Sequence, residues 1–398
     1  MIKNNSINYD ILYLIFVFLI GSTLFTSLRF TNIPIGIGEV ILLVLGIYMI
    51  INNYKELNYN FFKNSLLLKF WIVSFVLLLA GFLISFFLEN ILFYKSIFHD
   101  TFAYIFIFYL LIIMHLFEYD KKKHMEIFEK FIYFSLIFYT ILFISFVSFE
   151  SVIPFNKGSE VMVRYLGLSN NPNQLAILFT IIPFMLVYFY QKMPKIYFLD
   201  STFLLILLTF CIGEAIGSDA LFLGWCSGLF TYLLLIYISK YNNFKINIFF
   251  VVIISIIFTV VLFNFKEIIY FIDGGDSSAD ARIILIKNAF NDLDKMIYFG
   301  FGPGPHSYAP IDETMYWEVH NMYIDWFTQT GIIGILLFIY ILYKVVQGLY
   351  LNKEFILISA FVSLLIFITF HFTFRQPIFW FFMFFFYIMS QGEKKCVA

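Results

Sequence analysis

The sequence is poor in charge and in cysteine, and each shortage excludes a class of protein. Only 13% of the 398 residues are charged, whereas 62% are hydrophobic and 22% aromatic. No water-soluble domain of this size could bury so much apolar surface. The net charge of -1 gives no support for nucleic acid as a partner. The three cysteines provide neither a disulfide framework nor metal-ligand spacing. The composition therefore predicts a polytopic membrane protein.

Twelve stretches are long and apolar enough to cross a bilayer, which takes about 20 helical residues. We expect an all-α transmembrane helical bundle of about 12 spans that forms a single integral membrane domain over residues 1–398. The last two spans could instead form one long broken helix followed by a re-entrant piece. No inverted repeat and no separate soluble domain is visible. The expected spans cover approximately residues 9–28, 33–51, 65–88, 100–118, 127–149, 173–190, 196–212, 219–238, 246–263, 321–346, 355–374 and 376–391.

Lysine placement gives the expected orientation, because loops on the cytoplasmic side carry more basic residues. The loops on the side of the N-terminus hold most of the 21 lysines, so both termini are predicted to be cytoplasmic. All four arginines, Arg29, Arg164, Arg282 and Arg375, fall on the outer side. For Arg29, a coding bias toward lysine together with the preference for positive charge on the cytoplasmic side is a sufficient explanation of its placement. For Arg164 and Arg282 we favour a functional reading, since a planar guanidinium holds a phosphate by two parallel hydrogen bonds.

The first outer loop, residues 150–172, ends in a helix start signal. Asn171 is suited to be the cap and Pro172 the first helical residue, with Asn173 behind them. A helix N-terminus offers free N–H groups and a partial positive charge, so Arg164 folded over it could bind an anion. An ordinary capped helix beside a solvated arginine fits the spacing equally well.

The second outer loop, residues 264–320, is long and polar, and we expect it to carry part of an active site. Residues 279–293 have apolar side chains at Ile283, Ile286, Ala289, Phe290 and Leu293, the spacing of an amphipathic helix. Such a helix often lies at the lipid interface, but the arginine at its start, residue 282, is also placed to point inward.

A glycine-proline turn follows this helix. Gly302 and Gly304 stand in the turn 300–305, which is neither helix, strand nor Walker loop and brings backbone close to another group. His306 behind it is interpreted as a polar loop residue.

His320 begins the return into the membrane, with Asn321, Tyr323 and Asp325 close behind it. Near a helix start the charged form of histidine is disfavoured, so His320 is expected to be neutral near pH 7 and able to accept a proton. A polar cluster at membrane depth needs a cavity, a partner or a function. An interfacial histidine among waters is the alternative.

The residues around this helix start have simpler expected roles. Trp317 and Trp326 are predicted to be interface anchors. Gly331 and Gly334 are predicted to permit close helix packing. The acids Glu39, Glu214 and Asp219 could relay protons, but we favour pairing with the outer arginines.

Together these motifs resemble the O-antigen ligase and O-antigen polymerase superfamily of bacterial membrane glycosyltransferases. The resemblance runs from about residue 160 onward. The matching features are Arg164-x-x-Gly167 with Asn171-Pro172-Asn173, the helix led by Arg282, the turn Gly300-Phe301-Gly302-Pro303-Gly304, and His320-Asn321-x-Tyr323 followed by Gly331-x-x-Gly334.

The resemblance implies an enzyme of the bacterial cytoplasmic (inner) membrane that transfers a glycan from undecaprenyl pyrophosphate to an acceptor hydroxyl at the outer, periplasmic or extracellular, face. His320 would be the general base and Arg282 would hold the pyrophosphate, with Arg164, Asn171, Asn173, Gly302, Gly304, Asn321 and Tyr323 in substrate binding. No metal and no cofactor is expected, because arginines take over the stabilisation of charge.

The implied substrates are a lipid-linked glycan donor and an acceptor that is either another lipid-linked repeat or the lipid A core. The protein would work in the lipid bilayer, with a chain-length regulator or a flippase as candidate partners. A polymerase of surface polysaccharide is the leading hypothesis and an O-antigen ligase the alternative. Two alternatives belong to other classes of protein: a flippase that uses the intramembrane acids for coupling, and a non-catalytic assembly scaffold.

One position departs from the family. Relatives commonly have Ser-Arg-Gly or Ser-Arg-Ala at the start of the eighth span, where this chain has Ser218-Asp219-Ala220. If that arginine contacts the pyrophosphate in relatives, this protein must use fewer charges, recruit Arg375 or Arg29, or accept a donor with a different head group.

Overall fold

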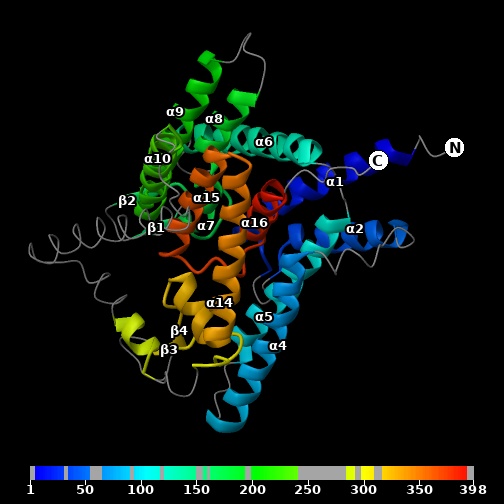
Figure 1. Ribbon diagram of the computed structural model, residues 1–398, viewed down its shortest axis with the longest axis vertical. Helices are drawn as coiled ribbons and strands as arrows, with labels where there is room; N and C mark the ends of the chain where they lie inside the picture. The colour runs from blue at the N-terminus through cyan, green and yellow to red at the C-terminus, as the bar shows by residue number, and fades with distance from the viewer. Residues whose placement is uncertain are drawn as a thin grey trace, which may run out of the picture.

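The computed structural model describes residues 5–30, 35–53, 65–89, 94–116, 121–148, 156–158, 162–192, 199–240, 284–291, 297–308 and 316–391. This part of the chain is predominantly helical (Figure 1). Two short antiparallel hairpins lie in its loops, β1 (Asn156–Gly158) with β2 (Met162–Arg164), and β3 (Ser307–Tyr308) with β4 (Tyr316–Trp317). The main helices are α1 (Asn5–Ser22), α2 (Ile37–Asn53), α4 (Leu66–Ile84), α5 (Tyr94–Leu116), α6 (Lys121–Ser148), α7 (Pro172–Phe179), α8 (Ile182–Lys192), α9 (Leu199–Ile216), α10 (Asp219–Lys240), α14 (Met322–Leu351), α15 (Phe355–Ile368) and α16 (Pro377–Ser390).

The expected class is confirmed: the protein is an all-helical, multi-pass membrane protein. Six helical segments of the described chain are long and apolar enough to cross a membrane, and five shorter apolar helices accompany them. The predicted span at 246–263 lies outside the described residues, so the count of twelve and the loop between spans nine and ten remain predictions. The six segments are Leu66–Phe87, Ser96–Leu116, Lys121–Val147, Pro172–Lys192, Asp219–Lys240 and Met322–Leu351.

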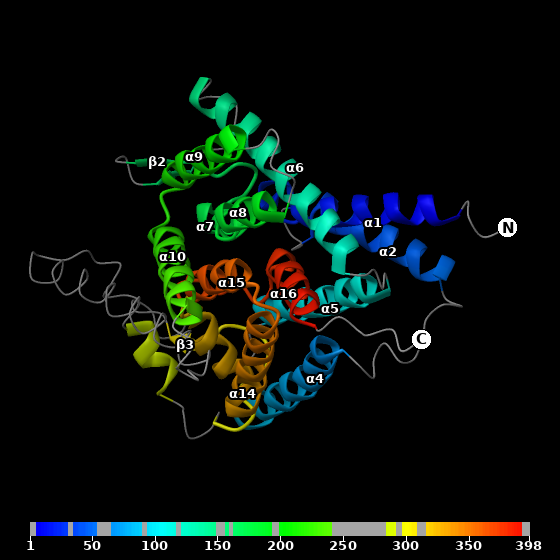
Figure 2. The same cartoon turned by 45° about the horizontal axis from the view of Figure 1, so that its top comes forward.

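Helices α15 and α16 form the centre of the bundle. Each has 14 residues, and nearly every side chain in both is buried. At 1.5 Å per residue each is about 21 Å long, shorter than a hydrocarbon core of about 30 Å. Figure 2 shows them enclosed by α5, α8, α10 and α14. The break between them, residues 369–376, therefore lies inside the protein, where irregular backbone is tolerated.

Glycines on α10 allow α15 to approach closely. A Cβ added at Gly224 would come within 2.8 Å of the Ser363 carbonyl oxygen, and one at Gly228 within 2.8 Å of that of Ser359. Small residues four positions apart commonly mediate such contacts between membrane helices. The sequence predicts close helix packing at residues 331 and 334 instead.

An aromatic cluster fills the space between α4, α14 and the 369–376 break. Trp326 is fully buried there and stacks on Phe374, with ring centroids 3.9 Å apart and planes inclined by 8°. Trp71 and Trp380 complete the cluster with centroids 4.8 Å apart. The prediction of Trp326 as an interface anchor is therefore wrong, because its ring belongs to the core, whereas Trp317 is exposed.

Gly331 breaks α14 rather than smoothing a helix contact. Its φ of 67° lies in the left-handed region, which a glycine adopts without a Cβ penalty. The break frees carbonyl oxygens that a neighbouring loop uses: the Phe301 amide donates to Thr328 at 2.8 Å and the Gly302 amide to Gln329 at 3.0 Å. The glycine-proline turn is thereby fixed against α14.

Candidate functional site

His320 lies on a short loop whose backbone is held on both sides by one buried carboxyl group. Asp325, in the first turn of α14, accepts from the Val319 amide at 2.8 Å and from the Asn321 amide at 3.1 Å. His320 between them has a φ of 59°, which is uncommon for a residue other than glycine. Its side chain is exposed. The arrangement presents the imidazole from a backbone that has little freedom to move.

Asn321 acts as the cap of the helix that follows. Its side-chain oxygen accepts from the amides of Tyr323 and Ile324 at 3.0 and 3.1 Å. Tyr323 is half-buried against Phe338, with ring centroids 6.2 Å apart. The predicted helix start is therefore present, and the oxygen of Asn321 is committed to it.

A charge network ties the His320 loop to the bundle. Arg375, in the break between α15 and α16, donates to Glu318 at 2.5 Å and to Asp100 of α5 at 3.0 Å. Burial works to lower the pKa of Arg375, but the carboxylates of Glu318 and Asp100 raise it above its ordinary value. Arg375 thus links three segments that are far apart in the sequence. One of its partners, Glu318, stands two residues before His320.

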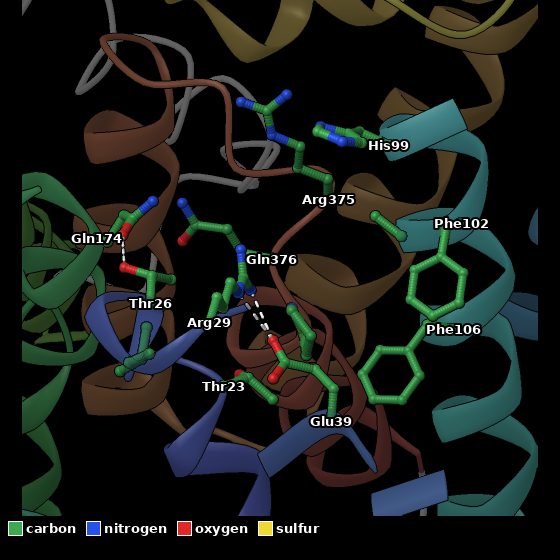
Figure 3. Close-up of a pocket in the computed structure, with 13 residues that line it drawn as sticks. Thr23, Thr26, Arg29, Glu39, His99, Phe102, Phe106, Gln174, Arg375 and Gln376 are labelled. Carbon is green, nitrogen blue, oxygen red and sulfur yellow. Dashed lines mark hydrogen bonds and ion pairs between the residues drawn. The ribbon is translucent and has the colours of Figure 1, made fainter. Parts of the chain in front are cut away.

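Arg375 also lines a cavity of about 240 Å³ between the first helices, α5 and the 369–376 break (Figure 3). Helix α5 contributes His99 together with Phe102 and Phe106, and the rest of the wall is largely polar. The whole wall is formed by Thr23, Leu24, Thr26, Arg29, Glu39, His99, Phe102, Ala103, Phe106, Gln174, Arg375, Gln376 and Pro377.

The N-terminus of α7 reaches the same cavity through Gln174. Asn171 caps this helix by accepting from the Asn173 amide at 2.9 Å, with Pro172 as the first helical residue, which confirms the start signal read from the sequence. Gln174 accepts from the Thr26 hydroxyl at 2.6 Å, and that hydroxyl accepts from the Asn170 amide at 2.8 Å. These bonds join the end of α1 to the start of α7.

Arg164 does not fold over the start of α7. Its guanidinium donates to the carbonyl oxygens of Ile216, at 2.9 Å, and Gly217, which end α9. Burial lowers the pKa of Arg164, and the charge of Asp219 opposes this effect. The helix end takes up these donors because its last carbonyls lack partners within the helix. Arg164 and the Asn171 cap therefore belong to different contacts.

The three acids singled out from the sequence differ in their environments. Glu39 is buried and accepts from Arg29 at 2.7 Å, so the expected pairing with an outer arginine is confirmed there. Glu214 and Asp219 are exposed.

The glycine-proline turn is packed between helices. A Cβ on Gly302 would come within 2.6 Å of the Phe82 amide nitrogen of α4, and one on Gly304 within 3.4 Å of the Ile97 side chain. His306 at its end is 9% exposed and hydrogen-bonds the Gly302 oxygen at 2.8 Å. Burial lowers the pKa of His306 to about 4. His306 is a loop residue, as predicted, and the structure adds that it is buried.

The predicted amphipathic helix is present over residues 284–289 of the described chain, and Arg282 lies outside the described residues. Leu285 and Ala289 pack against Val319, whereas Ile286 and Phe290 are 37% and 39% exposed. The buried face thus differs from the predicted one, because the helix packs on the His320 loop through Leu285.

Sequence reasoning missed four groups that the fold brings to this site: Asp100, Glu318, Gln174 and the side chain of Gln376. Asp100 carried a usable signal, since an acid at the start of an apolar span calls for a cationic partner. The two glutamines carried none, because amides occur throughout loops.

Two comparisons with known proteins bear on the family of this chain. No curated protein matches the chain. Residues 202–339, about a third of the chain, match the family model described as O-antigen ligase. The matched region contains His320, Asn321, Tyr323, Asp325 and the turn at 300–304. This part of the chain is thus similar to the O-antigen ligase family, which is consistent with the superfamily that the sequence motifs resemble.

Proposed function

We propose that the protein polymerises undecaprenyl-pyrophosphate-linked oligosaccharide repeats into a surface polysaccharide, at the outer face of the bacterial cytoplasmic membrane. The observation that carries the proposal is the exposed His320 on a left-handed backbone that Asp325 holds from both sides. A base must be held in position to remove a proton from a bound hydroxyl, and such fixation is what this loop supplies.

In the proposed reaction His320 takes the proton of the acceptor sugar hydroxyl as its oxygen attacks the anomeric carbon of the donor. The bond from that carbon to the pyrophosphate oxygen breaks, and lipid pyrophosphate leaves with the electron pair. Arg282 is proposed to hold the leaving group, and Arg164, Asn171, Asn173, Gly302, Gly304, Asn321 and Tyr323 stay proposed as substrate contacts. Of these, Arg164 has its donors on the end of α9.

A glycan ligase would use the same donor chemistry, so the acceptor decides between the two. Polymerase is favoured because the acid at Asp219 departs from the arginine that relatives carry there. The flippase alternative has one candidate coupling carboxylate fewer, because Glu39 pairs with Arg29 and accepts from the Gly36 amide at 3.0 Å.

The test is a gene deletion complemented by variants, followed by gel analysis of the surface glycan. For a polymerase the deletion leaves single repeats, whereas for a ligase it leaves full-length chains that are not attached to the envelope. His320→Ala and Arg282→Ala should both reproduce the deletion. Unchanged polymer length and attachment in both would rule out the enzyme.

His320→Gly is the matched control for backbone strain, since glycine adopts the same φ without an imidazole. Loss of polymer in both the alanine and the glycine variant assigns the effect to the side chain. A glycine variant with normal polymer would show that His320 is not the base.

A further inference from the structure

The break between α15 and α16 contacts the chain on both sides of His320. Arg375 in the break donates to the Glu318 carboxylate at 2.5 Å, two residues before the histidine. Thr373 in the same break donates its hydroxyl hydrogen to the sulfur of Met322 at 3.1 Å, two residues after the histidine. One segment from a distant part of the chain therefore holds both ends of the loop that carries the imidazole.

The break itself is firmly built. The Gln376 amide donates to the Thr373 carbonyl oxygen at 2.9 Å, and the indole of Trp380 donates to the Phe374 carbonyl oxygen at 2.7 Å. Thr373 and Phe374 are fully buried. Because close-packed interiors resist rearrangement, the break provides a fixed point for the loop.

Arg375 extends this attachment to α5. One nitrogen atom of its guanidinium, Nη1, donates to Asp100 at 3.0 Å, while the other, Nη2, holds Glu318. The Asp100 side chain is 1% exposed, so it requires a cation and keeps Arg375 in place. Figure 3 shows the guanidinium pointing away from Arg29 and Glu39 in the cavity. A planar fork reaches two carboxylates at once, which the single ammonium of a lysine does less well.

Asp325 and Arg375 constrain the loop in different ways. Asp325 belongs to α14, the helix that follows the loop, so its bonds to the Val319 and Asn321 amides fix the shape of the loop but not its place in the bundle. The bond from Arg375 to Glu318 comes from outside that helix and fixes the place. Place matters as much as shape, because a displacement of about 1 Å in a catalytic group can lower a rate roughly a hundredfold.

We propose that Arg375 is a positioning residue for the glycosyl transfer. Anchored by Asp100, it holds Glu318 and thereby sets where the His320 imidazole meets the acceptor hydroxyl. The consequence for the reaction rests on the proposed function. The anchoring of the loop to α5 does not.

The decisive variant is Glu318→Gln, because it removes the tie to the loop and leaves the buried pair of Arg375 and Asp100 in place. The assay uses the full chain in lipid nanodiscs and the lipid-linked single repeats that accumulate in the deletion strain. Glu318→Gln should lower kcat about tenfold, the loss of one charge-assisted hydrogen bond, and leave KM and the unfolding midpoint unchanged. Arg375→Lys should lower kcat to a similar extent, and the double variant should lose little more than either single one.

The matched control is Glu354→Gln. Glu354 pairs with Lys192 at 3.3 Å, and its side chain is 19% exposed against 21% for Glu318. This pair lies beyond the opposite end of the 30-residue helix α14. The control should change neither kcat nor KM.

Spin labels report the place of the loop without catalysis. They are attached at two exposed positions, through Trp317→Cys in β4 and Ile105→Cys on α5, in a chain whose three native cysteines are replaced by serine. The distribution of label distances should widen in Glu318→Gln and Arg375→Lys and stay unchanged in the control.

Unchanged distances in both variants would overturn the proposal, and so would a loss of kcat in Glu354→Gln equal to that in Glu318→Gln. A lower unfolding midpoint with normal kcat in Glu318→Gln would assign the network a structural role alone. His320→Ala separates this inference from the proposed function. If that variant polymerises normally while Glu318→Gln widens the distances, the catalytic role of His320 fails and the anchoring of the loop stands.

Discussion

Replacing Asp325 by alanine removes both acceptors that hold the backbone around His320. Val319 is 2% exposed, so its amide would be left buried and unpaired, at about 1–3 kcal/mol. Asn321 is half-exposed, and water can replace part of its bond, so its loss is about 0.5–1.5 kcal/mol. The total of about 1.5–4.5 kcal/mol is comparable to the roughly 1–3 kcal/mol of strain at a left-handed residue. The loop is expected to relax.

A loss of about 2 kcal/mol changes the ratio of held to released loop about 30-fold, since 1.4 kcal/mol is tenfold. We therefore expect Asp325→Ala to lower the polymerisation rate of the purified protein about 30-fold or more. Asp325→Asn keeps one oxygen, which can still accept from Val319, and should lower the rate about three- to tenfold.

Hydrogen exchange at the amides of Val319 and Asn321 reports the same event without catalysis. Both amides should exchange faster in the alanine variant. The control is Thr328→Val one turn along α14, because Thr328 is buried but bonds only the Asp325 carbonyl of its own helix through its hydroxyl. Unchanged exchange in Asp325→Ala, or an equal loss of rate in the control, would refute the positioning role.

Two further outcomes follow from the loops packed on α14. Gly331→Ala places a Cβ at φ 67° against the Tyr298 backbone, and we expect it to lower the free energy of unfolding by more than about 2 kcal/mol. The unfolding midpoint in detergent should fall accordingly, whereas Ile333→Ala, at an exposed position, should shift it little. Similar midpoints for the two variants would contradict the break in α14. Because the pKa of His306 falls to about 4 from 6.5, its burial opposes protonation, so stability is complete above pH 6.5 and falls as pH drops toward 4, by about 2 kcal/mol at pH 5. His306→Gln should flatten this dependence between pH 7 and 5, and an equal slope in both proteins would show that His306 is not the group responsible.

Local signals in the sequence identified the helix starts correctly. Asn171 caps α7 as predicted, and α14 begins directly after His320-Asn321, where a helix start was predicted, because a helix start depends on residues within one turn. The burial of Trp326 and the break at Gly331 were not predicted, because both depend on contacts with distant parts of the chain. Their environments are set by Phe374 and by the 297–302 loop, which approach from elsewhere in the chain.

Composition and apolar runs by themselves determined that this is a multi-pass helical membrane protein. A long apolar run belongs in lipid, and there a helix satisfies all of its own backbone hydrogen-bonding groups. The sequence also placed a histidine at a helix start within the region that matches the O-antigen ligase family model. Only the tertiary structure decided what surrounds it. Because α15 and α16 are short and central, the break between them brings Arg375 and Gln376 to Arg29, Gln174 and the His320 loop, and these contacts depend on packing between helices that no local pattern encodes.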